Sequence, residues 1–309
     1  MKNFKTILSV FIIIIFIGML NLSAKGKSKL PKKLKEAFEK TEVGETIKTG
    51  LELNFSKIKF FPAQGEKTNI IIGFNFKELK GEKDNLKDNE KKDSELKDVL
   101  AIRIINKKKK KEKVTVFAQV DNSGRDYKDS YYFEIQAKPG EYEIIGIIST
   151  RNLKKMGSQK IDLKVPDMFP DKVALSSLVL YKNIKQLDEA PIGFKVYKNS
   201  YPMGMYMVYP LEKNIVESGE NPRLLYFIIG AKTNKLSRKY QLQITYRLLQ
   251  GEKVVEKYKP VVVNNTVVDQ PLPLIVKGEK LAGKYSFEIE VMDIVSRNKT
   301  KKTIELLYK

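Results

Sequence analysis

The sequence contains no cysteine and no histidine in 309 residues. Without thiols no disulfide can cross-link the fold, so each domain must be stabilised by core packing alone. The two absences exclude Ser-His-Asp triads, cysteine nucleophiles, imidazole general bases and nearly all zinc, copper and iron sites. We therefore expect a protein that is not an enzyme and has no cofactor or metal. A remote alternative is a hydrolase that uses paired carboxylates.

Acidic residues are outnumbered, with 37 Asp and Glu against 58 Lys and Arg, a net charge of +21. This surplus favours polyanions or anionic surfaces as partners, although lysine-rich composition also arises without any binding role. The apolar content of 42% predicts a mostly globular chain, and the length is sufficient for two ordinary domains.

The one long apolar run lies at the N-terminus, in residues 6–20, between Lys2 and Lys5 on one side and Ser23-Ala24 on the other. It is shorter than the about 20 apolar residues that cross a bilayer. Residues 1–24 have the pattern of a secretory signal peptide, with an uncleaved anchor as the alternative. We expect an exported protein, periplasmic, envelope-associated or secreted, that touches the membrane only through this segment if it is uncleaved.

We interpret residues 25–47 as a basic tether followed by a short helix. Leu34, Ala37 and Phe38 recur at helical spacing, with charged residues on the other face. The pattern predicts a helix that packs on the first domain.

From Gly50 the apolar period changes to two, and short strand patterns alternate with Gly, Pro, Asn and Asp. This pattern predicts an all-β fold of two tandem β-sandwich domains, Ig-like or fibronectin-III-like. We expect a first sandwich at 48–166 with a charged insertion at 78–98, a linker with an apolar strand at 167–200, and a second sandwich at 201–309.

The two predicted sandwiches repeat each other. Gly140-x-Tyr142 recurs 143 residues later as Gly283-x-Tyr285, and the same offset aligns Ala101 with Ile244. Further upstream the offset is 154, as in the match of residues 70–71 to 224–225. We interpret the pattern as a tandem duplication.

The Gly-x-Tyr turns predict a structural role. A tight turn at Gly140 or Gly283 leads into a strand, and the following tyrosine, Tyr142 or Tyr285, can hydrogen-bond to the upstream backbone, as in the tyrosine corner of Ig-like sandwiches. Carbohydrate stacking on the two rings is the alternative.

Five consecutive lysines lie between two predicted strands: Lys107, Lys108, Lys109, Lys110 and Lys111. The position predicts a solvated hairpin tip, with contact to a polyanion or to lipid headgroups as the alternative. The absence of interleaved aromatic residues disfavours nucleic acid as a partner.

Met203, Met205 and Met207 alternate with other residues, which predicts three methionines on one face of a strand. Such a face fills an irregular core or forms an adaptable interaction surface. A Cu(I) thioether site is a weak alternative, because no His or Cys accompanies the methionines.

Several short motifs resemble a known family: Leu30-Pro31 before the helix, the Gly140 turn, Gly157-Ser158, Val165-Pro166-Asp167 and the apolar run 174–180. Over residues 30–309 the chain resembles the C-terminal β-sandwich region of exported von Willebrand factor A-related proteins of Acidobacteria, which is similar to segments found with GWxTD-motif proteins. No Asp-x-Ser-x-Ser metal site precedes the sandwiches, so neither metal-dependent adhesion nor any functional residue carries over. The resemblance implies an envelope protein.

These observations lead to one main expectation and one alternative. The main one is an exported, non-catalytic envelope protein that acts as a protein-interaction, structural or adhesion-type module with an unidentified envelope partner. The alternative is a periplasmic protein that binds polyanions or glycans through its lysine-rich segments.

Overall fold

The computed structural model describes residues 30–79, 98–120, 129–217, 220, 222–265, 274–275 and 282–309. The predicted signal segment, the tether up to residue 29 and most of the charged insertion lie outside these residues. The described residues form strands in several sheets and the α-helix α2 (Lys32–Glu42). The all-β sandwich prediction is confirmed.

The first sandwich consists of two sheets around one core. Outer sheet 1 has the order β1 (Lys48–Thr49), β8 (Met156–Val165), β7 (Gly140–Ser149), β4 (Asp98–Asn106), β5 (Lys113–Val120). Inner sheet 1 has the order β11 (Val196–Lys198), β6 (Tyr131–Ala137), β3 (Lys67–Glu78), β2 (Leu51–Ala63). Alternate residues of the two sheets fill the space between them, among them Leu53, Ile70, Phe74, Leu100, Phe133 and Ile144.

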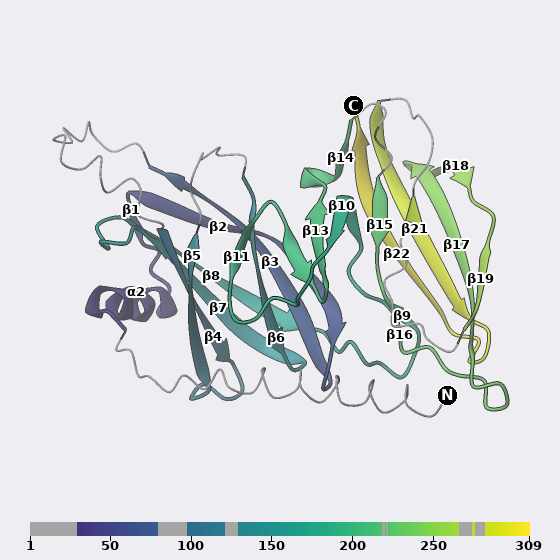
Figure 1. The fold of residues 1–309 in the computed structure, drawn as a ribbon, viewed down its shortest axis with the longest axis horizontal. Coiled ribbons are helices and arrows are strands. Elements are labelled where there is room, and N and C mark those ends of the chain that lie inside the picture. The colour runs from purple at the N-terminus through teal and green to yellow at the C-terminus, as the bar shows by residue number, and fades with distance from the viewer. Residues whose placement is uncertain are drawn as a thin grey trace.

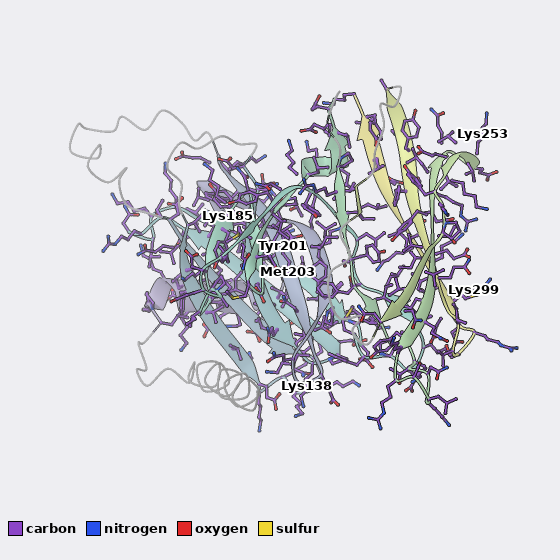
Figure 2. The ribbon with its side chains drawn as sticks, turned by 45° about the vertical axis from the view of Figure 1, so that its right-hand side comes forward. Lys138, Lys185, Tyr201, Met203, Lys253 and Lys299 are labelled. Atoms are coloured by element: carbon purple, nitrogen blue, oxygen red, sulfur yellow. The ribbon has the colours of Figure 1, made fainter. Side chains whose placement is uncertain are left out.

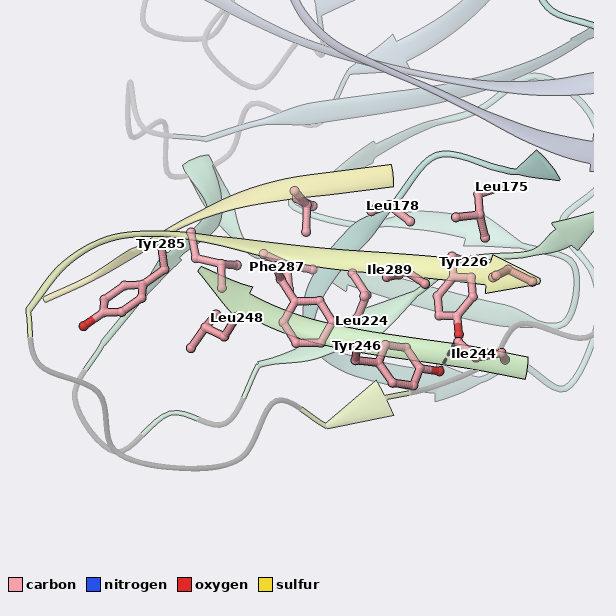
Figure 3. Close-up of a cluster of buried hydrophobic side chains, with 14 of the residues drawn as sticks. Leu175, Leu178, Leu224, Tyr226, Ile244, Tyr246, Leu248, Tyr285, Phe287 and Ile289 are labelled. Atoms are coloured by element: carbon pink, nitrogen blue, oxygen red, sulfur yellow. Dashed lines mark hydrogen bonds between the residues drawn. The ribbon is translucent and has the colours of Figure 1, made fainter. Parts of the chain in front are cut away.

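The second sandwich repeats this arrangement. Inner sheet 2 has the order β12 (Tyr201–Met203), β13 (Tyr206–Pro210), β10 (Val179–Gln186), β15 (Arg223–Leu225), β20 (Leu274–Ile275). Outer sheet 2 has the order β14 (Ile215–Val216), β22 (Lys299–Tyr308), β21 (Gly283–Asp293), β17 (Tyr240–Gln250), β18 (Lys253–Lys257), and β19 (Val261–Asn265) also pairs with β17. Two short elements complete it, the pair β9 (Ala174–Leu175) with β16 (Ile228–Ile229) and the 3-10 turn η2 (Glu212–Asn214). Figure 3 shows its core.

The four sheets are stacked, with α2 at one end and outer sheet 2 at the other (Figure 1). A separate apolar cluster joins inner sheet 1 to inner sheet 2, and its members include Phe61, Ile71, Tyr132, Val179, Tyr181, Tyr201 and Phe227. The middle of β3, the start of β10 and the end of β15 are therefore buried on both faces. This double burial explains why residues 69–76 and 224–229 are nearly continuous in apolar residues rather than alternating.

The segment predicted as a linker, 167–200, is built into both sandwiches. Strands β9 and β10 belong to the second sandwich, whereas β11 pairs with β6 at the edge of the first. Within β10, Leu180 points into the second core and Val179 into the cluster between the sandwiches. The linker prediction is wrong here because residues 179–181 of β10 are buried on both faces and so lack the period of two by which sandwich strands were recognised.

Helix α2 packs on outer sheet 1, as the sequence predicts. Leu34, Ala37 and Phe38 are buried against apolar residues of β4 and β7, namely Ala101, Ile105, Ile145 and Ile147. On the exposed side Lys32 pairs with Glu36 and Lys35 with Glu39, each at 3.8 Å. Exposed pairs of this kind contribute little, so the apolar face holds the helix in place.

Strand pairing tests the predicted repeat in detail. Gly140 pairs with Val165, and Gly283 pairs with Tyr308, so the β7–β8 and β21–β22 hairpins share one register at the 143-residue offset. The alignment of Ala101 with Ile244 is wrong, because Ala101 faces α2 whereas Ile244 faces the second core. Strand β4 corresponds to β17 at an offset of 144 instead. A slip of one residue turns every side chain to the opposite face.

Candidate functional site

The Gly-x-Tyr turns lie inside the fold. The hydroxyl of Tyr142 donates a hydrogen bond to the backbone carbonyl of Lys138 at 3.0 Å, the bond expected of a tyrosine corner. Burial raises the pKa of this hydroxyl. Gly140 and Gly283 both have φ of 153°, and Tyr285 is buried edge-to-face against Tyr308 at 5.4 Å. The residue that corresponds to Lys138, four positions before Tyr285, lies outside the described residues.

The lysine run forms the tip of the β4–β5 hairpin. Asn106 Oδ1 accepts hydrogen bonds from the backbone N–H groups of Lys108 and Lys109, which closes the turn. Lys107 pairs with Asp162 at 2.8 Å, and this hydrogen bond raises the pKa of Lys107.

The remaining lysines of the tip are solvated. Lys109 pairs with Glu112 at 3.1 Å, whereas Lys108, Lys110 and Lys111 are exposed and form no ion pair with the described residues. The predicted hairpin tip is confirmed, and contact with a polyanion stays a prediction.

The three methionines do not share one face of one strand. Gly204 (φ 59°) and Met205 form the two-residue turn between β12 and β13, since Met203 pairs directly with Tyr206. Met203 is buried between the sandwiches, and Met205 is 40% exposed at the turn. Met207 follows Tyr206 and therefore points to the face opposite Met203. The predicted methionine face is wrong, because the glycine lets the chain reverse where the alternation suggested a continuous strand.

The contact between the sandwiches also holds polar groups that the sequence did not single out. Phe60 and Ser177 exchange two hydrogen bonds at 2.9 and 3.0 Å. Lys59 donates to the carbonyl of Leu178 at 3.2 Å, and Lys302 of β22 donates to that of Ser176 at 2.9 Å. Cations from both sandwiches therefore donate hydrogen bonds to the segment that connects β9 to β10.

Glu134 is a half-buried carboxyl on the face of β6 that carries Tyr132. Burial raises its pKa to about 7, although hydrogen bonds from Asn69 and Gln136 act in the opposite direction. A single acidic residue within the apolar strand 131–135 was the sequence signal for it.

A small cavity of about 20 Å³ lies between the inner sheets. Its lining includes Lys57 and Lys59 from β2, Tyr132 from β6, Tyr201 from β12 and Asn214 from η2. Figure 2 labels Tyr201 and Met203, which are both buried in the cluster between the sandwiches. The hydroxyl of Tyr201 is buried and has no hydrogen-bond partner among the described residues.

The outer edge of outer sheet 2 carries exposed apolar side chains. Strands β18 and β19 both pair with β17, and within the described residues no strand pairs with their other side. Four valines on them are exposed by 42 to 67%, namely Val254, Val255, Val261 and Val262. Figure 1 shows both strands at the margin of the molecule.

Two carboxylates of outer sheet 2, those of Glu288 and Glu290, form ion pairs. Arg247 pairs with Glu288 at 2.8 Å and with Glu290 at 2.7 Å, and Lys301 pairs with Glu288 at 2.9 Å. In the described part of the chain no three acidic residues are placed to hold a metal ion. Nor does any described helix have the length and apolarity to cross a membrane.

Comparisons with known proteins add little to this geometry. No family model matches the chain, and no curated protein matches it. Among solved structures, trypsin-activated alpha-2-macroglobulin from Escherichia coli is similar over 85% of this chain, with 11% identity and a TM-score of 0.24. The chain spans 17% of that protein. Because the TM-score is this low, the fold assignment rests on the sheet topology alone.

Proposed function

We propose that this chain is an exported, non-catalytic protein of the cell envelope that binds a protein partner along the β18–β19 edge. The observation that carries the proposal is the set of four exposed valines on an edge that no described strand covers. An edge of this kind offers backbone N–H and C=O groups to an added strand, and its side chains select that strand.

The residues that flank this edge favour binding of a selected partner over pairing between copies of the chain. Lys253 and Lys257 bracket β18, and Pro260 directly precedes β19. Lysine and proline on an edge discourage indiscriminate pairing between copies. The exposed valines beside these residues remain available to a partner strand that tolerates the lysine charges.

Capture from envelope extracts of the native host tests the proposal. Lysine at Val255 and Val262 places charge on the edge, so we expect the double variant to lose a partner that the wild type retains. Leu236→Lys is the matched control, because Leu236 is 96% exposed in the turn before β17, belongs to neither β18 nor β19, and should leave capture unchanged. Equal capture by all three proteins contradicts the assigned edge.

Export has its own test. The pattern of residues 1–24 supports a signal peptide. Mass spectrometry of the protein from a fractionated native host should find it outside the cytoplasm with an N-terminus near Lys25. An intact N-terminus in the membrane fraction supports the uncleaved anchor, and a cytoplasmic protein contradicts export.

Polyanion binding is the second candidate function, because Lys108, Lys110 and Lys111 project from the β4–β5 hairpin without ion pairs to the described residues. Replacing these three lysines by glutamine should then shift elution from immobilised heparin to clearly lower salt. Glutamine at Lys182, Lys185 and Lys253 is a control of equal charge. The same shift in both triple variants indicates a general effect of net charge and contradicts a hairpin site.

A further inference from the structure

The β18–β19 edge carries two cations between two exposed apolar side chains. Val254, Lys257 and Val262 pair with residues of β17 that alternate with its core residues, so all three lie on the face away from the second core. Lys259 is exposed and follows Tyr258, which packs against that core. Along the chain the edge therefore presents Val254, Lys257, Lys259 and Val262 in this order.

The charge of these two lysines is not balanced within the described part of the chain. Lys257 and Lys259 form no ion pair with any described carboxylate. Glu256 pairs in register with Leu248, a core residue, so its side chain starts toward the opposite face. A second copy of this chain would bring the same two cations to the edge. Like charges on neighbouring strands are unfavourable, so the charge favours a different partner.

The same sheet shows how a neighbouring strand can neutralise a cation on this face. On the other side of β17, strand β21 places Glu288 and Glu290 two positions apart beside Arg247. Arg247 pairs with these carboxylates at 2.8 and 2.7 Å. A strand added beyond β18 would stand to Lys257 and Lys259 as β21 stands to Arg247.

Resting on the proposed function of this edge, we propose that its partner is an extended peptide segment with two acidic residues, two positions apart, between two apolar residues on the same face. The acidic side chains pair with Lys257 and Lys259, and the apolar ones cover Val254 and Val262, which are 45% and 67% exposed. Backbone hydrogen bonds hold the segment on the edge, and the order of side chains selects it. This order is the same in both chain directions, so it fits a parallel or an antiparallel strand.

Four labelled synthetic peptides test the proposal against the full purified chain by fluorescence anisotropy at low salt. The acidic probe is Val-Thr-Glu-Thr-Glu-Thr-Val. Two others replace both glutamates by glutamine or by lysine, and the fourth has proline between the glutamates, which keeps the charge but disrupts strand pairing.

We expect saturable binding of the acidic peptide, about 3- to 10-fold tighter than binding of the glutamine peptide and weakened by added sodium chloride. The lysine and proline peptides should bind more weakly than the acidic one. Equal affinity for the acidic and glutamine peptides, or no saturable binding of the acidic peptide, overturns the proposal. Equal affinity for the acidic and proline peptides indicates general attraction of polyanions and overturns it as well.

Charge reversal locates the effect. The double variant Lys257→Glu with Lys259→Glu should prefer the lysine peptide to the acidic one. Lys138→Glu with Lys185→Glu is the matched control, because it changes the net charge equally at exposed lysines that belong to neither β18 nor β19 (Figure 2). The control should keep the wild-type preference. An acidic preference that persists in the Lys257 and Lys259 variant contradicts the assigned pairs.

Capture from envelope extracts separates this proposal from the proposed function. Capture that depends on Val255 and Val262 but survives reversal of Lys257 and Lys259 leaves the edge as a binding site and overturns the acidic preference. Capture that does not depend on the two valines contradicts the edge itself.

Discussion

At the scale of single residues, the second core contains a pair of buried hydroxyl groups. The oxygens of Tyr226 and Tyr246 lie 2.6 Å apart within an apolar cluster (Figure 3). Burial raises the pKa of both hydroxyls, so both are neutral and one donates to the other. Each hydroxyl therefore depends on the other for its hydrogen bond.

We expect Tyr246→Phe to lower the free energy of unfolding by about 1–3 kcal/mol, because it leaves the Tyr226 hydroxyl without a partner. The double change to phenylalanine should cost less than the two single changes added together. Urea unfolding of the four proteins in this cycle measures the coupling. Strictly additive effects would show that the two hydroxyls do not depend on each other.

Glu134 makes the stability depend on pH. Its pKa is about 7 in the folded protein, above its ordinary value of 4.5, so the folded state holds the proton more tightly. This contribution is complete below pH 4.5, decreases as the pH rises, and is lost above pH 7. The wild type should lose about 1–3 kcal/mol relative to Glu134→Gln between pH 5 and 8.

Urea unfolding at pH 5, 6, 7 and 8 measures this difference. Glutamine keeps the shape of the side chain but does not titrate, so its stability should change less with pH. Burial and the charge of Glu134 raise the pKa of Tyr197, a phenol that stays neutral over this range. Parallel curves for the two proteins would rule out the pH dependence assigned to Glu134.

At the scale of elements, the outer faces of the two outer sheets differ in what lies on them. Helix α2 covers outer sheet 1, where the Arg103 guanidinium lies 4.1 Å above the Phe38 ring and 3.6 Å from Glu42. Arg247 corresponds to Arg103 in register, but it pairs with Glu288 and Glu290 on outer sheet 2. Outer sheet 1 is covered by the apolar face of α2, whereas outer sheet 2 carries an ion-pair network.

Phe38→Ala should therefore lower the free energy of unfolding by about 3–5 kcal/mol, because a fully buried ring leaves a cavity under α2. Lys33→Ala on the exposed side of the same helix should change it by less than about 0.5 kcal/mol. Denaturant titrations of both variants compare these values. Similar small effects in both would mean that α2 does not depend on this contact.

At the scale of the whole molecule, the contact between the inner sheets should make the two sandwiches unfold together. The rings of Phe61 and Phe227 meet at 5.9 Å, and those of Tyr132 and Tyr201 at 5.4 Å. We expect one calorimetric transition for the wild type and two for Phe227→Ala, which removes a central ring of this contact. Leu236→Ala at an exposed loop is the control and should keep one transition. Two transitions in the wild type would contradict the coupling.

Local patterns in the sequence were sufficient to identify an element where only one of its faces is buried. The spacing of Leu34, Ala37 and Phe38 identified α2, and alternation identified most sandwich strands. Gly140-x-Tyr142 also revealed its turn, because the bond from Tyr142 to Lys138 is made within five residues. Periodicity reports burial of this kind because the solvated and buried faces differ in polarity.

Only the tertiary structure decided what lies between the sandwiches. The absence of cysteine and histidine excluded whole classes of chemistry, but it could not place Glu134 beside Asn69, or Lys59 and Tyr201 in the lining of one cavity. These groups come from strands far apart in the chain, and their contacts depend on two sheets packing face to face. For the same reason Met203 and Met207 look equivalent in the sequence, yet a turn at Gly204 sends them to opposite faces.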